Sequence, residues 1–219
     1  MSIAILTANF GNFDKPVEYA LQTVEYDFYK FTDENFPPRH CSMTPRLQAR
    51  LVKCFGWQMV PEHDYYIWMD QSYALLHSKS VSWLVQQCQG FDIVVFHHPR
   101  RFTIQKEADY LKHRLRKGCE YITARYKNEL IDEQLAEIFA DKSFEDTQLF
   151  QSSTLVYQNN PTVRAMFKEW WYHITRYHTV DQLALPYVLW KSGCKVNVIL
   201  VPMNYNYLKV PYLTQTRYL

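Results

Sequence analysis

Short apolar segments alternate along the chain with longer segments in which apolar residues recur at helical spacing. The short segments predict buried β-strands over residues 3–7, 24–31, 65–69, 92–96, 154–157 and 196–201. The longer segments predict helices over residues 46–54, 80–87, 104–117, 128–140, 162–175 and 180–191. Strands that alternate with helices favour an α/β fold with a mostly parallel central sheet that helices cover on both faces.

Capping and turn residues mark several boundaries. Thr44 followed by Pro45 is typical of a helix start, and Ser192-Gly193 of a helix end. Pro16 fits the first turn of a further helix, and residues 35–42 predict a loop. The chain contains no repeat or linker, and 219 residues is a usual size for one domain, so we expect a single domain over residues 1–219.

Charge and glycine content narrow the function classes. The formal net charge is +2, from 24 Lys and Arg against 22 Asp and Glu, which argues against nucleic acid as a partner. Only 5 glycines are present, and neither a P-loop motif nor a Rossmann motif occurs. Neither a serine-hydrolase elbow nor an H-E-x-x-H zinc motif is found.

Cysteine spacing and hydropathy bear on the cellular compartment. The five cysteines are scattered and form no C-x-x-C motif, which is typical of reduced thiols. Neither a signal peptide nor an apolar run of membrane-spanning length is recognisable. We therefore expect a soluble cytoplasmic protein without a membrane span.

The most informative segment is the predicted strand 65–69 with the polar residues after it, which reads Trp68-Met69-Asp70-Gln71-Ser72. A carboxylate at the tip of a buried strand can bind a hard divalent cation that bridges the oxygens of a diphosphate. Capping of the next turn is the alternative role for Asp70.

A second group of polar residues follows the predicted strand 92–96. His97, His98, Arg100 and Arg101 gather hydrogen-bond donors there, and Glu107 lies on the next helix. Such donors suit phosphate or sugar hydroxyls. A solvated basic turn is the alternative interpretation.

The third group surrounds Asp181. Trp170-Trp171 precedes it, and His178 lies three residues before Asp181-Gln182. A carboxylate in the first turn of a helix is favoured by the helix dipole, so Asp181 needs no catalytic role to explain it. Adjacent helical tryptophans point in different directions, and core packing is their more common role.

The fourth group combines Thr7 and Asn9, at the end of the first predicted strand, with three cations of the helix 46–54. Arg46, Arg50 and Lys53 recur at helical spacing and share one face. This positive stripe can hold a diphosphate, or it can be an ordinary solvated face.

Together, the order and spacing of these motifs resemble GT-A glycosyltransferases. The W-x-D-x-S pattern at Trp68, Asp70 and Ser72, the His-Pro block and the later Asp-Gln are similar to the DUF616 glycosyltransferase-like group and, more loosely, to a short chlorovirus glycosyltransferase domain. Two departures stand out. Ser72 replaces the second acidic residue of a D-x-D motif, and an R-D-Q motif is absent because His178 occupies the nearest basic position.

The resemblance implies a transferase that moves a sugar from a nucleotide-diphospho-sugar, expected to be a UDP-sugar, to a glycan or other hydroxyl acceptor. Asp70 and Ser72 would hold Mn²⁺ or Mg²⁺, Asp181 would act at the reacting sugar, and His97 is a second candidate base. The implied donor-binding residues are Thr7, Asn9, Arg46, Arg50, Lys53, Asp70, His98, Arg100 and Gln182.

Two other functions stay open. A non-catalytic domain that binds nucleotide sugars or carbohydrates is compatible with the loss of the strict metal motif at Ser72. A hydrolase is compatible because a fold does not fix the chemistry. For a viral protein, the location would be the host cytoplasm.

Overall fold

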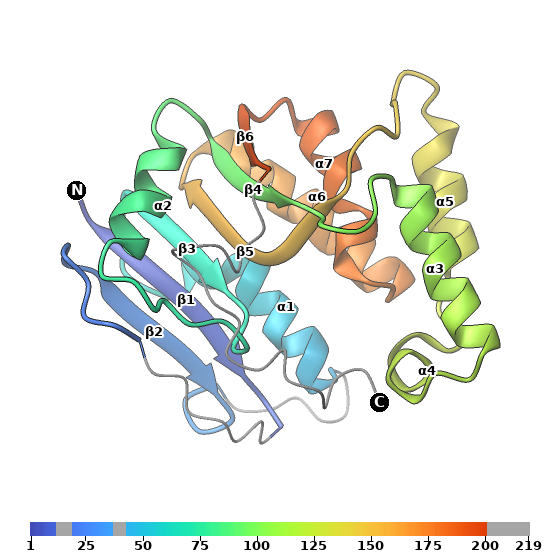
Figure 1. Ribbon diagram of the computed structural model, residues 1–219, viewed down its shortest axis with the longest axis horizontal. Helices are drawn as coiled ribbons and strands as arrows, with labels where there is room; N and C mark the ends of the chain where they lie inside the picture. The colour runs from blue at the N-terminus through green and yellow to red at the C-terminus, as the bar shows by residue number, and fades with distance from the viewer. Residues whose placement is uncertain (12–18, 37–42, 201–219) are drawn as a thin grey trace.

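The computed structural model of the chain describes residues 1–11, 19–36 and 43–200. These residues form one six-stranded sheet with helices on both faces (Figure 1). The strands are β1 (Ile3–Asn9), β2 (Asp27–Thr32), β3 (Tyr65–Met69), β4 (Ile93–His97), β5 (Phe150–Gln158) and β6 (Val196–Ile199). The helices are α1 (Pro45–Phe55), α2 (Ser80–Cys88), α3 (Ile104–Arg116), α4 (Glu120–Tyr126), α5 (Ile131–Ala140), α6 (Pro161–Tyr177) and α7 (Leu185–Ser192), with the 3₁₀ turns η1 (Gly56–Gln58) and η2 (Asp181–Leu183).

The strands lie in the order β2-β1-β3-β5-β4-β6. Strand β1 pairs in parallel with β2 and β3, and β4 pairs in parallel with β6. Strand β5 runs antiparallel to its neighbours β3 and β4. All strands of the described part except β5 therefore point the same way, which confirms the predicted α/β fold with a mostly parallel sheet.

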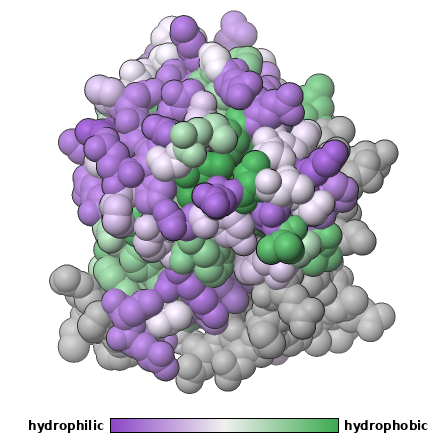
Figure 2. Space-filling model, turned by 90° about the vertical axis from the view of Figure 1, so that its left-hand side faces the viewer, coloured by the Kyte–Doolittle hydropathy of each residue, from purple (hydrophilic) through white to green (hydrophobic). Residues whose placement is uncertain are grey.

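The two faces of the sheet carry different layers. Leu6, Trp68 and Leu155 belong to a large core that includes residues of α1, α3, α5, α6 and α7. Their strand neighbours alternate to the other face, where Ile67 and Val156 pack in a smaller core with α2. The side of the molecule that carries α2 and β2 is mostly hydrophilic around a small hydrophobic area (Figure 2), as is usual for a water-facing surface.

Two predicted helices differ from the structure. The helix expected over 180–191 is divided into η2 and α7, because Pro186 has no N–H for a continuous helix and its ring would clash with the carbonyl of Gln182. The helix expected over 128–140 begins at Ile131, since Asn128 adopts a left-handed conformation at φ 65°. Helix α4, just before Asn128, was not predicted.

Other local expectations are confirmed. Thr44 caps α1 by accepting the Leu47 N–H at 3.2 Å, and Gly193 ends α7 at φ 68°. The described cysteines, Cys54, Cys88, Cys119 and Cys194, are free thiols. Among the described residues, no helix is long and apolar enough to cross a bilayer. The helix expected at Pro16, most of the loop 35–42 and residue 201 of the last predicted strand lie outside the described residues.

Candidate functional site

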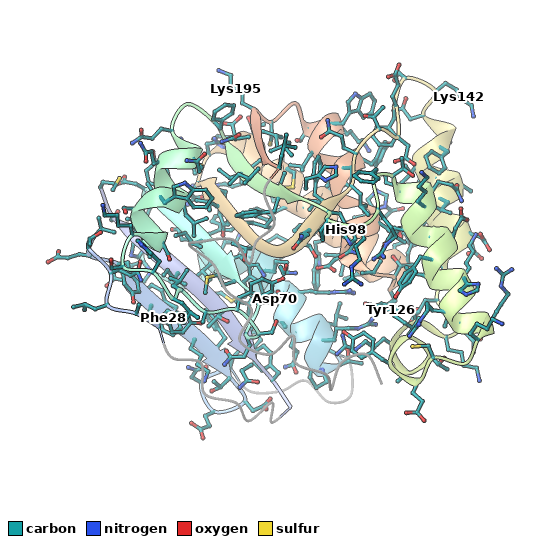
Figure 3. All side chains as sticks on the ribbon, viewed as in Figure 1. Phe28, Asp70, His98, Tyr126, Lys142 and Lys195 are labelled. Atoms are coloured by element: carbon teal, nitrogen blue, oxygen red, sulfur yellow. The ribbon has the colours of Figure 1, made fainter. Side chains whose placement is uncertain are left out.

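Three parallel strands end at the same edge of the sheet, and polar side chains lie at each end. Asn9 ends β1, Asp70 follows β3, and His97 ends β4. Figure 3 shows Asp70 at the tip of β3 beside α1, and His98 farther toward α3. Ligands of open α/β sheets bind at the carboxyl ends of the parallel strands, so this edge is the candidate site.

Asp70 presents a carboxylate that is partly open to solvent, with a side chain that is 40% exposed. Its Oδ1 accepts a hydrogen bond from the Trp68 indole N–H at 2.9 Å and lies 3.5 Å from the Lys53 ammonium. The Asp70 N–H donates to the Ser153 carbonyl of β5 at 2.8 Å, which holds the strand end in place. Partial burial raises the pKa of Asp70, and the positive charge of Lys53 offsets only part of that effect.

Asp181 is the opposite case, a buried carboxylate between two cations. Its Oδ2 lies 2.7 Å from the Lys53 ammonium, and its Oδ1 lies 3.4 Å from the Arg50 guanidinium. The Trp170 indole N–H donates to its backbone carbonyl at 2.8 Å. Burial by itself raises the pKa of Asp181, but Lys53 and Arg50 outweigh it, so the pKa lies below the usual value. Asp181 is therefore an ionised anchor for two cations.

The cations of α1 share one face, as predicted, and that face points inward. Arg50 and Lys53 are buried, so the solvated-face interpretation is wrong for both. Arg50 also donates to the Thr179 carbonyl at 2.9 Å. Burial lowers the pKa of Lys53, but Asp181 and Asp70 reverse this, and the net shift is upward. Lys53 is therefore a permanent positive charge beneath the strand ends.

Arg46 lies one turn earlier on α1 and is less deeply buried. Its Nη2 donates to the His178 carbonyl at 3.4 Å, and its guanidinium stacks 4.7 Å from the centre of the Tyr126 ring. Its Nη1 is buried and has no hydrogen-bond partner among the described residues. A donor in that situation is suited to an anionic ligand.

The basic turn after β4 is organised around His98. Its Nδ1 accepts backbone hydrogen bonds from Arg100 at 3.2 Å and Arg101 at 2.9 Å. Burial and then the charge of Arg101 lower the pKa of His98 to about 4, so the imidazole is neutral at pH 7. His97 has a different neighbour, with its ring centre 5.3 Å from that of Phe102.

Glu107 joins the basic turn to the Asp181 segment. It is buried, pairs with Arg101, and accepts a hydrogen bond from the Gln182 amide at 2.8 Å. The polar residues that follow β4 and those around Asp181, two separate groups in the sequence, are therefore connected through one carboxylate. Gln182 is fixed next to Asp181 by this contact.

The remaining candidates lie at different depths. Thr7 is fully buried, so its hydroxyl does not line the surface, whereas Asn9, two residues later, is half-buried at the strand end. Ser72 lies in the turn after Asp70 and is also half-buried. Arg100 is exposed. The edge thus offers Asn9, Asp70, Ser72 and Arg100 to a ligand, with the α1 cations beneath.

Whether a divalent ion such as Mn²⁺ or Mg²⁺ suits this edge depends on the ligand atoms around Asp70. Among the described residues, no group of three or more His, Cys, Asp or Glu side chains could hold a metal ion. Asp70 and Ser72 supply oxygen ligands, the kind that these hard ions prefer, and Mg²⁺ commonly binds one or two carboxylates together with substrate phosphates. With these two residues, an ion at this edge would need a bound diphosphate to complete its coordination.

Sequence reasoning missed two contacts that organise the site. Trp170 is fully buried, as its core assignment predicts, yet its N–H also fixes the Asp181 backbone. Tyr126, on the unpredicted helix α4, stacks on Arg46. The one available signal was Pro186, because a proline inside the predicted helix indicates that Asp181 lies before the helix rather than within it.

Comparisons with known proteins give distant matches. No protein-family model matches this chain, and no curated protein matches its sequence. Among solved structures, the apo form of mouse xyloside xylosyltransferase 1 is similar at a TM-score of 0.48, with 9% identity, over 91% of this chain and 85% of that chain. A197 from STIV is similar at a TM-score of 0.32, with 8% identity, over 91% of this chain and 82% of that chain. The function therefore has to be inferred from the residues of the site.

Proposed function

We propose that this chain is a GT-A glycosyltransferase that transfers a sugar from a nucleotide-diphospho-sugar, a UDP-sugar in the simplest case, to a hydroxyl of a glycan or another acceptor. One observation carries the proposal. Asp70 is a half-exposed carboxylate at the carboxyl edge of parallel strands, directly above the buried cation Lys53. The W-x-D-x-S pattern that ends at Ser72 supports the same assignment.

The donor diphosphate would lie across this edge. Arg46 offers a buried N–H donor that has no partner among the described residues, and Arg100 is exposed in the turn after β4. Guanidinium groups match phosphate oxygens in geometry and charge. Beneath them, Arg50 and Lys53 add a fixed positive field. The nucleoside would then lie beside Asn9, with the buried Thr7 supporting that strand end from behind.

Asp70, with Ser72, would hold Mn²⁺ or Mg²⁺ against the diphosphate. When bound, such an ion stabilises the negative charge that develops on the departing diphosphate. Asp70 contributes a hard carboxylate oxygen, and Ser72 contributes a weaker neutral one. The indole N–H of Trp68 fixes the orientation of the Asp70 carboxylate.

Proton transfer from the acceptor is better suited to His97 than to Asp181. Asp181 is held by Lys53 and Arg50, and its lowered pKa makes it a weak base. His97 follows Phe96, which packs in the core beside α2, so the alternation along β4 turns His97 toward the face that carries α1. We therefore assign proton acceptance to His97 and cation positioning to Asp181, with Gln182 beside the donor sugar.

A thermal-shift screen of nucleotide sugars with and without Mn²⁺ tests donor binding. A ligand at 100 times its dissociation constant should stabilise the fold by about 2.7 kcal/mol. Donors that bind are then tested for transfer. Asp70→Asn should abolish transfer, whereas Asp64→Asn, a carboxylate just before the opposite end of β3, should retain it. Equal transfer by both variants would contradict the role of Asp70.

A nucleotide-sugar-binding domain without transfer is the second candidate. The observation in its favour is that Ser72 stands where a second carboxylate would strengthen the metal site. Donor binding without transfer to any acceptor would identify this function. Release of free sugar in the absence of an acceptor would instead indicate a hydrolase.

A further inference from the structure

Lys53 lies between the two carboxylates of the site. Its ammonium is 2.7 Å from Asp181 Oδ2 and 3.5 Å from Asp70 Oδ1. The Lys53 side chain is 5% exposed, and its ammonium also lies 5.4 Å and 5.9 Å from the centres of the Trp68 and Trp170 rings. These contacts hold its positive charge in place beside Asp70.

That charge affects how Asp70 can bind a cation. Asp70 Oδ1 already accepts the Trp68 N–H and faces Lys53, so a divalent ion at this carboxylate meets a like charge a few ångströms away. Ser72 brings no negative charge to compensate. In the described part of the chain, no group of three or more His, Cys, Asp or Glu side chains could hold a metal ion. The protein alone therefore offers a divalent ion few ligands and an adjacent positive charge.

A diphosphate would change this balance, because its oxygens add ligands and its negative charge offsets both Lys53 and the ion. We propose that Lys53 keeps Asp70 from holding a divalent cation until a nucleoside diphosphate is bound, so that cation and donor bind only together. This inference rests on the proposed function and adds to it an order of assembly, with Lys53 as a positioning residue.

Titration of the full chain with Mn²⁺, followed by electron paramagnetic resonance of the free ion, tests this inference without an activity assay. The unmodified protein should bind Mn²⁺ weakly alone and at least about tenfold more tightly with UDP. Lys53→Met should bind Mn²⁺ without UDP at least about tenfold more tightly than the unmodified protein. Lys53→Arg keeps the positive charge and should not show this gain.

Lys53→Met leaves Asp181 without one of its partners, so this variant can fail to fold. The double variant Lys53→Met/Asp181→Asn removes both charges together and should also bind Mn²⁺ more tightly than the unmodified protein, by a smaller factor because the negative charge of Asp181 is lost as well. In the single variant Asp181→Asn, Lys53 keeps its charge and Asp70 is the carboxylate that still faces it. This variant should therefore bind Mn²⁺ no more tightly than the unmodified protein.

Mn²⁺ binding by the unmodified protein that is equally tight with and without UDP would overturn the inference and leave the proposed function standing. An unchanged Mn²⁺ affinity in the folded double variant would also overturn it. If neither UDP nor any nucleotide sugar binds with or without Mn²⁺, the proposed function fails, and the inference fails with it.

Discussion

The Lys53 ammonium lies 2.7 Å from Asp181 and 3.5 Å from Asp70, and the two carboxylates have very different surroundings. Asp181 is buried with two cationic partners, and its pKa lies below the usual value. Asp70 is 40% exposed, and its pKa lies above the usual value. The same lysine therefore serves two different carboxylates.

The difference shows how one cation can support both structure and ligand binding. The Asp181 carboxylate satisfies the charges of Arg50 and Lys53 inside the protein, and this keeps those charges beneath the strand ends. Asp70 retains solvent access and can therefore meet a ligand. The segment around Asp181 thus holds the cations of α1 in place, whereas the carboxylate at the tip of β3 stays accessible to a ligand.

The largest expected effect is on folding stability in Asp181→Ala. This change leaves two buried cations without their shared carboxylate, and breaking a buried pair from one side typically costs about 3–5 kcal/mol. Urea denaturation should show that loss in the free energy of unfolding. Asp70→Ala should lose less than about 1 kcal/mol, because its ion pair is partly solvated. Equal losses of unfolding free energy in the two variants would show that Asp181 is no more important for folding than Asp70.

As the pH changes, the two carboxylates should alter the free energy of unfolding in opposite directions. Asp181 has a lower pKa in the folded state, so its stabilisation is present above the unfolded pKa of about 4 and is lost as the pH falls further. Asp70 has a raised folded pKa, so its contribution is present below about pH 4 and is lost as the pH rises through the folded value.

Urea unfolding from about pH 3 to about pH 6 measures this contrast. Relative to the unmodified protein, Asp181→Asn should become progressively less stable as the pH rises, and Asp70→Asn progressively more stable. If the stability of both variants relative to the unmodified protein changes in the same direction as the pH rises, the two carboxylates do not have oppositely shifted pKa values.

The sheet and the residues at its edge were largely predictable, and the partners of those residues were not. The strand over 65–69 is confirmed residue for residue, because a short branched and aromatic run between polar turns leaves little choice. The spacing of Arg46, Arg50 and Lys53 also gave the correct shared face. What spacing could not show is where that face points.

The direction of that face depends on contacts far along the chain. Lys53 and Asp181 are separated by 128 positions, and Arg50 and Asp181 by 131. Local periodicity carries no information on such pairs, and a run of cations usually indicates a solvated helix face. The break between η2 and α7 was predictable in principle, since Pro186 cannot continue the helix that would contain Asp181.

Two buried tryptophans provide a smaller, matched test. The Trp170 N–H donates to the Asp181 carbonyl at 2.8 Å, and the Trp68 N–H donates to Asp70 Oδ1 at 2.9 Å. Replacement by Phe removes the same atoms from both. Trp170→Phe should lose about 1 kcal/mol more in the free energy of unfolding, because it leaves a buried carbonyl without its donor. In Trp68→Phe, the Asp70 carboxylate still has Lys53 and solvent as partners. A larger loss of unfolding free energy in Trp68→Phe than in Trp170→Phe would therefore contradict the comparison.

The smallest expected stability effect is that of Asp70→Asn. The amide oxygen can still accept the Trp68 N–H, and the lost attraction to Lys53 is offset because a neutral amide carries no charge to be partly buried. The free energy of unfolding at pH 7 should therefore change by no more than about 0.5 kcal/mol, measured by urea denaturation. A loss of several kcal/mol would instead make Asp70 a structural residue like Asp181. With the fold intact, any loss of sugar transfer in this variant would reflect the carboxylate itself, which is the property that separates Asp70 from Asp181.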